Sequence, residues 1–168
     1  MRILLTLITI IFTFFITGCS LTQVSLPSYK KDISTYKNSK TYNNINISEA
    51  LLNHYKSWEG VEYKYGGNNK NGIDCSFFVK DSFTTLNKKL PRTTLYQSKS
   101  GIAISKKELQ TGDLVFFITS KKGTRHVGIY LDDGDFMHVS TSRGVMISNL
   151  ENPYWKRHYW KSRRVLID

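Results

Sequence analysis

Apolar residues recur at steps of three and four along two stretches in the first half of the chain. The first stretch covers residues 48–58, and Ser48 is its expected N-cap. The second covers residues 75–87, follows a glycine-rich loop and has Asp74 as its expected N-cap. The pattern predicts two amphipathic helices, and a shorter helical segment is expected within residues 90–99.

The second half of the chain changes to β-rich runs with turn residues between them. The turns are marked by Lys122-Gly123, Asp132-Asp133-Gly134 and Arg143-Gly144. The runs cover residues 113–118, 126–131, 135–140 and 145–148. Helices first and antiparallel strands afterwards predict an α+β fold.

The first residues have the layout of an export signal. Arg2 precedes an apolar run that ends on Gly18 and Cys19, and this run is short for a transmembrane span. The ending resembles the bacterial lipoprotein signal, in which cleavage precedes the Cys and acyl chains are attached to it. We therefore expect a signal peptide over residues 1–18, then the lipidated Cys19 and a flexible tether over residues 19–47, and one folded domain over residues 48–168.

Composition adds two constraints on function. The formal net charge of +11 favours anionic partners such as membrane head groups or acidic wall polymers, while export argues against nucleic acid. The alternative is a solvated surface that serves solubility alone.

The chain has two cysteines, so lipidation of Cys19 would leave Cys75 without a disulfide partner in the chain.

Cys75 lies where the second helix is expected to begin. Unpaired backbone N–H groups and the positive end of the helix dipole favour the thiolate, which is the nucleophilic form. The charge of Asp74 opposes the thiolate, so a nucleophile at this position needs a base. The competing interpretation is a small, buried and inert cysteine.

His126 and His138 are the candidate base and its partner. A three-residue hairpin loop would pair Gly128 with His138 and place both imidazoles on one sheet face as diagonal neighbours. This arrangement predicts Cys75 as nucleophile, His126 as base and His138 as the residue that orients the base, with Gly128 leaving room for a helix terminus or substrate. Zinc binding by the three residues and two unrelated strand histidines are the alternatives. No further cysteine or carboxylate cluster completes a structural zinc site, so we expect no metal and no cofactor.

A series of motifs runs from about residue 50 to the end of the chain. The motifs are Tyr63-x-Tyr65-Gly66-Gly67, Gly72-x-Asp74-Cys75-Ser76, Leu90-Pro91-Arg92, Gln97, Leu109-x-x-Gly112-Asp113-Leu114-Val115-Phe116, His126-Val127-Gly128-Ile129-Tyr130 and His138. In order and spacing they resemble the NlpC-type cell-wall cysteine peptidases. The resemblance implies a papain-like α+β fold in which the nucleophile helix packs on an antiparallel sheet.

The same resemblance implies a function and a location. The implied reaction is hydrolysis of amide bonds in peptidoglycan stem peptides or cross-links through a thioester acyl-enzyme. The bond is left open between a D-Ala cross-link and the link from γ-D-Glu to diaminopimelate. The expected protein is a monomer that is attached by Cys19 to a membrane of the cell envelope, the outer membrane facing the periplasm. The sequence leaves another membrane open.

Further site residues follow from the resemblance alone. Tyr63 matches a tyrosine of the oxyanion site, while Asp74 and Ser76 match residues that flank the substrate cleft. The family usually has Gly where this chain has Phe77. On a helix Phe77 points away from the face of Cys75, so we expect altered packing and an intact nucleophile.

Three alternatives remain open. A non-catalytic wall-binding or scaffolding lipoprotein is one, and a thiol acyltransferase or amidase with the same Cys and His arrangement is another. The third concerns residues 154–164, which mix aromatic and positively charged side chains. This run is interpreted as an edge strand, with a wall- or membrane-binding surface as the alternative.

Overall fold

The computed structural model describes residues 42–167 of the 168-residue chain. The expected signal peptide, Cys19 and most of the expected tether lie outside the described residues. Within residues 42–167, no helix combines the length and the apolar character that a membrane crossing requires.

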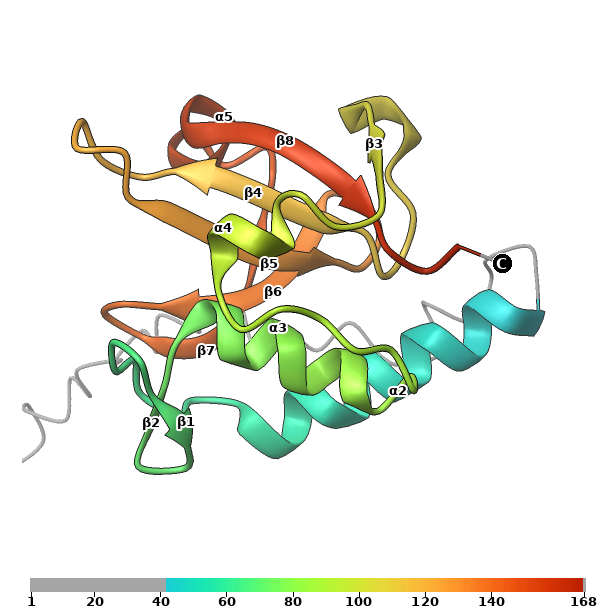
Figure 1. Ribbon diagram of the computed structural model, residues 1–168, viewed down its shortest axis with the longest axis horizontal. Coiled ribbons are helices and arrows are strands. Elements are labelled where there is room, and N and C mark those ends of the chain that lie inside the picture. Colours follow the sequence, from blue (N-terminus) through green and yellow to red (C-terminus); the bar gives the residue numbers. More distant parts are fainter. Residues whose placement is uncertain (1–41, 168) are drawn as a thin grey trace, which may run out of the picture.

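Two helices, α2 (Tyr42–Trp58) and α3 (Cys75–Thr84), lie together on one side of an antiparallel sheet (Figure 1). The core between these layers contains Leu51 of α2 and Phe78 of α3, and both side chains are fully buried. The prediction that the first helix begins after Ser48 is wrong, because Ser48 lies inside α2. Asparagine is a weak helix former, and the asparagines at the start of α2 hide the true beginning from a pattern search.

The sheet has six strands in the order β3-β8-β4-β5-β6-β7. Their bounds are β3 Ile102–Ile104, β4 Leu114–Ile118, β5 Arg125–Tyr130, β6 Asp135–Ser140, β7 Gly144–Asn149 and β8 Tyr159–Arg164. The predicted hairpin register is confirmed, since Gly128 pairs with His138. Asp133 and Gly134 in the loop have φ values of 51° and 86°, and these left-handed conformations suit a tight turn. The α+β prediction is therefore confirmed.

Short elements lie around this framework. They are β1 (Asn68–Asn69), β2 (Gly72–Ile73), α4 (Thr94–Gln97), the 3₁₀ helix η1 (Lys106–Glu108) and α5 (Pro153–His158). The helix α3 ends at Thr84, earlier than expected, and Asn87 with a φ of 55° follows in a turn. The helical segment expected within residues 90–99 is reduced to α4.

The interpretation of residues 154–164 as an edge strand is wrong. Residues 153–158 form α5, and β8 lies between β3 and β4, paired on both sides. Arginine side chains at this inner position still find partners. Arg163 donates to the backbone carbonyls of residues 99–101, and Arg164 forms an ion pair with the buried Asp113. Arg163 and Arg164, whose charges suggested exposure to solvent, therefore bind neighbouring segments and hold β8 in the sheet.

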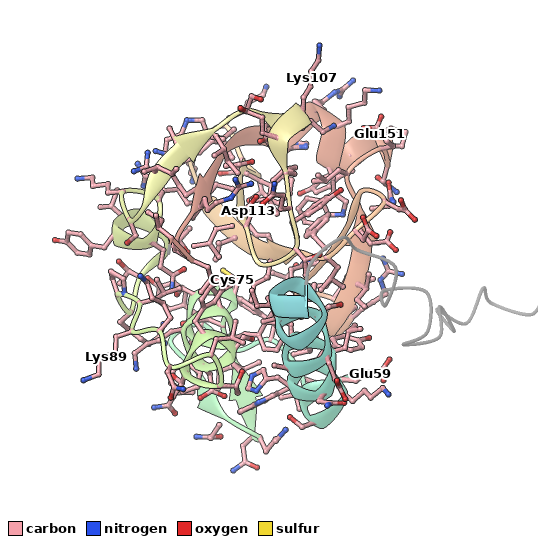
Figure 2. The ribbon with its side chains drawn as sticks, turned by 90° about the vertical axis from the view of Figure 1, so that its right-hand side faces the viewer. Glu59, Cys75, Lys89, Lys107, Asp113 and Glu151 are labelled. Atoms are coloured by element: carbon pink, nitrogen blue, oxygen red, sulfur yellow. The ribbon has the colours of Figure 1, made fainter. Side chains whose placement is uncertain are left out.

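We predict that Asp113→Asn lowers the free energy of unfolding by about 2 kcal/mol, because it replaces a charge-assisted hydrogen bond to Arg164 at a buried site. Glu151→Gln is the matched control. Glu151 pairs with Lys106 and Lys156 at the surface, where such pairs contribute about 0–1 kcal/mol. Figure 2 shows Asp113 within the fold and Glu151 at its periphery. Urea denaturation of both variants tests the contrast, and equal losses would contradict it.

Candidate active site

Cys75 is the first residue of α3, and Asp74 immediately before it caps the helix. The Asp74 carboxylate accepts a hydrogen bond of 2.8 Å from the backbone N–H of Phe77, which confirms the predicted N-cap. In Figure 2 the sulfur of Cys75 lies where the start of α3 meets the sheet. The thiol is thereby placed beside free N–H groups of the first helical turn.

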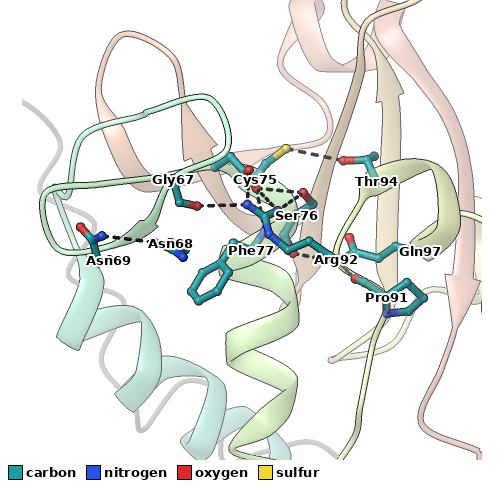
Figure 3. A network of polar contacts seen from close by, with 11 residues as sticks. Gly67, Asn68, Asn69, Cys75, Ser76, Phe77, Pro91, Arg92, Thr94 and Gln97 are labelled. Carbon is teal, nitrogen blue, oxygen red and sulfur yellow. Dashed lines mark hydrogen bonds and ion pairs between the residues drawn. The ribbon is translucent and has the colours of Figure 1, made fainter.

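The Asp74 carboxylate also receives two hydrogen bonds from Arg92, whose side chain lies beside the start of α3 in Figure 3. Arg92 Nη2 lies 2.6 Å from Asp74 Oδ2, and Nη1 lies 2.9 Å from Oδ1. Ser76 Oγ donates to Oδ1 at 2.8 Å and accepts from Arg92 Nη1 at 3.0 Å. Burial acts to raise the pKa of Asp74, but these hydrogen bonds outweigh it and hold the pKa below its ordinary value. The carboxylate is therefore ionised and fully engaged at neutral pH.

Arg92 and Gln97 hold the segment before α4 against the start of α3. Arg92 also donates to the carbonyl of Gly67 in the preceding loop, while the buried Gln97 donates to the carbonyls of Ser76 and Pro91 at 2.8 and 2.9 Å. The sequence pattern assigned no contact to Arg92, because no local periodicity links residues this far apart. The motif Leu90-Pro91-Arg92 was the only signal that could have identified it.

Phe77, which replaces the usual glycine, covers this ion pair. Its ring is partly buried against the core, and the Arg92 guanidinium carbon lies 5.3 Å from the ring centroid. Figure 3 shows the ring beside Arg92 and on the side away from the Cys75 sulfur. The substitution therefore adds a cation–π contact to the network that positions the helix start.

The Cys75 thiol is buried, with 8% of the residue exposed. Burial raises its pKa above the ordinary value, although the backbone N–H of Val127 and the hydroxyl of Thr94, 3.8 Å from Sγ, act in the opposite direction. The helix start alone therefore does not produce a resting thiolate, and a nucleophile at this position needs a base. Loss of hydration outweighs the helix dipole at this depth, so the thiol is protonated at neutral pH.

The two strand histidines are joined directly. His126 Nε2 lies 3.0 Å from His138 Nδ1, and the rings meet edge to face at 84°. His138 Nε2 in turn lies 2.9 Å from Ser148 Oγ on β7. Burial lowers the pKa of His126 to about 4 and that of His138 well below its ordinary value. Both imidazoles are therefore neutral at neutral pH.

Aromatic side chains enclose this pair. Trp155 of α5 stacks on His126 with centroids 5.4 Å apart and meets His138 edge to face at 4.8 Å. Phe136 fills the space above Gly128, since a Cβ at Gly128 would come within 2.6 Å of its ring. The expectation that Gly128 leaves room for a helix terminus or substrate is corrected by this contact. The aromatic cover removes water from the imidazoles, which explains the low pKa of each.

The packing of α3 on β5 brings the thiol beside Val127, the neighbour of His126. The backbone N–H that faces Cys75 Sγ belongs to Val127, the direct neighbour of His126. In the described part of the chain, His126 Nδ1 has no hydrogen-bond partner and no hydrogen bond joins His126 to Cys75. Tyr63 forms an isolated β-bridge with Ile73. Burial raises the pKa of the Tyr63 hydroxyl, and the nearby Cys75 thiolate raises it further. Nδ1 thus remains available for a proton.

Within residues 42–167, no group of three or more His, Cys, Asp or Glu side chains is arranged to hold a metal ion. His54 illustrates how the other histidines are used. Its ring packs against Trp58 and Phe78, and burial lowers its pKa.

The fold and the arrangement of Cys75 define a class of protein. Residues 60–164 match the NlpC/P60 family, and the chain belongs to this family. A solved NlpC/P60 family protein from Bacillus cereus superposes with a TM-score of 0.65 at 34% identity, covering 71% of this chain and 40% of its own.

Two curated relatives from Escherichia coli strain K12 narrow the comparison. Murein DD-endopeptidase MepS/Murein LD-carboxypeptidase is 45% identical over 124 residues, which cover 73% of this chain and 65% of the relative. The probable endopeptidase NlpC is 43% identical over 133 residues, which cover 76% of this chain and 84% of the relative. The chain thus spans less than two thirds of MepS.

The buried histidines predict acid sensitivity of the fold. Their folded-state pKa values lie below the unfolded value, so the unfolded state binds more protons as the pH falls. Their contribution is fully present above pH ~6.5 and is lost as the pH falls towards about 4. For His126 alone the expected loss of unfolding free energy at pH ~4 is about 3 kcal/mol. Urea denaturation from pH ~7 to ~4 measures the loss, and His126→Gln should reduce the slope. An unchanged slope in that variant would contradict the assignment.

Proposed function

We propose that this protein is a peptidoglycan hydrolase that cleaves amide bonds in murein peptides with Cys75 as the nucleophile. The observation that carries the proposal is the placement of a buried thiol at the start of α3, next to a strand whose His126 is hydrogen-bonded to His138. The names of the relatives, a murein DD-endopeptidase and a probable endopeptidase, support the same reaction class. The proposed reaction is D,D- or D,L-endopeptidase cleavage.

The pKa directions favour general-base catalysis over a preformed ion pair. Both the thiol and His126 rest in neutral forms. His126 Nδ1 takes the thiol proton as Sγ attacks the peptide carbonyl carbon, and free N–H groups at the start of α3 stabilise the oxyanion with Tyr63. The C–N bond breaks as His126 protonates the leaving amine. Water, deprotonated by His126, then hydrolyses the thioester and releases the acid and the thiol.

Asp74 and Ser76 are proposed to shape the cleft by holding its wall. Both are buried, and the carboxylate oxygens of Asp74 already accept bonds from Arg92, Ser76 and Phe77. The rigid start of α3 keeps the N–H groups aimed at the developing oxyanion, which is the condition for electrostatic stabilisation of a transition state. Phe77 supports the same wall through its contact with Arg92.

A cationic patch supports the proposed anionic substrate. Lys161 Nζ lies 4.1 Å from the ring centroid of the partly exposed Trp160, and the guanidinium carbon of Arg125 lies 5.9 Å from it. Burial lowers the pKa of Lys161, and the positive charges of Arg163, Lys99 and Arg125 act in the same direction. Murein stem peptides carry carboxylates, so an unneutralised positive field would raise their local concentration. The envelope location and the monomeric state are part of the proposal.

Cys75→Ala should reduce release of soluble peptides from purified sacculi by ~10⁴-fold or more, because no other group replaces the attacking sulfur. Mass spectrometry of the products measures this and separates the alternatives. A hydrolase adds water to the cleaved bond, whereas a transferase adds an acyl acceptor. The exposed Ser142→Ala is the control and should retain wild-type activity. Full activity in Cys75→Ala would exclude the thiol mechanism, and an inactive wild type would favour a scaffolding role. The fragment masses also identify the bond.

Lipid attachment at Cys19 is proposed from the sequence. In cells, Cys19→Ala should move the protein from the membrane fraction to the soluble exported fraction, since the attached acyl chains would be lost. Fractionation and the intact mass of the purified protein measure both effects. Membrane association and an unchanged acyl mass in Cys19→Ala would show that another residue carries the anchor.

A further inference from the structure

His138 of the hydrogen-bonded histidine pair contacts Ser148, a residue for which the sequence predicted no role. We propose that Ser148 is a positioning residue: its hydroxyl oxygen accepts a hydrogen bond from His138 Nε2–H and thereby sets the tautomer of His138 and, through it, of His126. The inference rests on the proposed function of Cys75 and His126. It adds a fourth member to the chain of groups that activates the thiol.

Strand pairing places Ser148 beside His138. In the register of β6 and β7, Phe136 faces Ser148 and His138 faces Met146, so His138 and Ser148 are diagonal neighbours on one face. The resulting contact of 2.9 Å joins His138 Nε2 to Ser148 Oγ. His138 is completely buried, and a buried ring nitrogen without a partner is costly. Ser148 supplies that partner.

Proton positions along the chain are coupled. For His126 Nδ1 to accept the thiol proton, the single proton of the neutral ring must lie on Nε2. This Nε2–H donates to His138 Nδ1 at 3.0 Å, so Nδ1 of His138 must be unprotonated and its proton must lie on Nε2. That proton needs an acceptor, which is Ser148 Oγ.

The reverse order of donors would stop the reaction. If His138 carried its proton on Nδ1, it would donate to His126 Nε2, and the proton of His126 would then occupy Nδ1. His126 Nδ1, the nitrogen that should receive the thiol proton, would then already be protonated and could not act as the base. When His126 becomes an imidazolium, its Nε2–H again requires an unprotonated Nδ1 on His138. A rotatable hydroxyl that accepts from Nε2 satisfies every stage, and His138 itself is completely buried.

Four variants of the full-length protein test the proposal. Ser148→Ala and Ser148→Val lack the hydroxyl, Ser148→Thr retains it, and Val and Thr have nearly the same shape. We expect kcat on murein fragments to fall about tenfold in the Ala and Val variants, with KM unchanged, and Thr to stay within about threefold of wild type. Ser140→Ala is the control, since Ser140 lies on β6 with His138 but bonds to Ser142. Because Thr and Val differ only in the hydroxyl, their comparison holds even if the Ala variant folds poorly.

Two readouts do not depend on peptidoglycan cleavage. Ring ¹⁵N shifts should show the His138 proton on Nε2 in wild type and redistributed towards Nδ1 in Ser148→Val. The rate of Cys75 alkylation by iodoacetamide at neutral pH should fall in Ser148→Val and not in Ser148→Thr. Equal kcat in the Val and Thr variants, or an unchanged tautomer in Val, would overturn the proposal. Slower alkylation in Val with no cleavage of sacculi by wild type would support Ser148 and refute the proposed function.

Discussion

The buried carboxylate of Asp74 connects the start of α3 to Arg92, and through Arg92 to the loop that contains Gly67. It caps α3, accepts from Ser76 and binds both terminal nitrogens of Arg92, which also reaches the carbonyl of Gly67. These bonds outweigh the cost of burying the charge, as the lowered pKa of Asp74 shows. Loss of the carboxylate would remove the cap of α3 and the partner of the Arg92 guanidinium at the same time, because both depend on the same two oxygens.

The sheet contributes a site of the opposite character. His126 and His138 are neutral and enclosed by aromatic rings, whereas the start of α3 is held by charges. Exclusion of water has two effects on catalysis. It keeps the resting thiol and imidazole uncharged, and it strengthens each electrostatic interaction once charge develops. The burial of both imidazoles makes the order of donors along His126, His138 and Ser148 decisive, since each ring nitrogen depends on its neighbour in the chain for a partner.

Phe77 shows how a departure from a family pattern can be absorbed. Its position on α3 directs the ring away from Cys75, as helical geometry predicted, and the ring lies against Arg92. The nucleophile is unaffected because the new side chain contacts the outer face of the network. The substitution thus adds a ring contact to Arg92, which the sequence could not show without the position of Arg92.

The sequence by itself determined the elements whose cause is local. Helical periodicity and a capping residue placed Cys75 at a helix start, and a three-residue loop fixed the register that brings His126 and His138 onto one face. Tertiary structure alone decided what surrounds them. Arg92, Trp155 and Ser148 reach Asp74, His126 and His138 from distant segments, and burial raises the pKa of the Cys75 thiol against the effect of the helix start. Caps and registers depend on neighbours along the chain, whereas desolvation depends on every segment packed around a group.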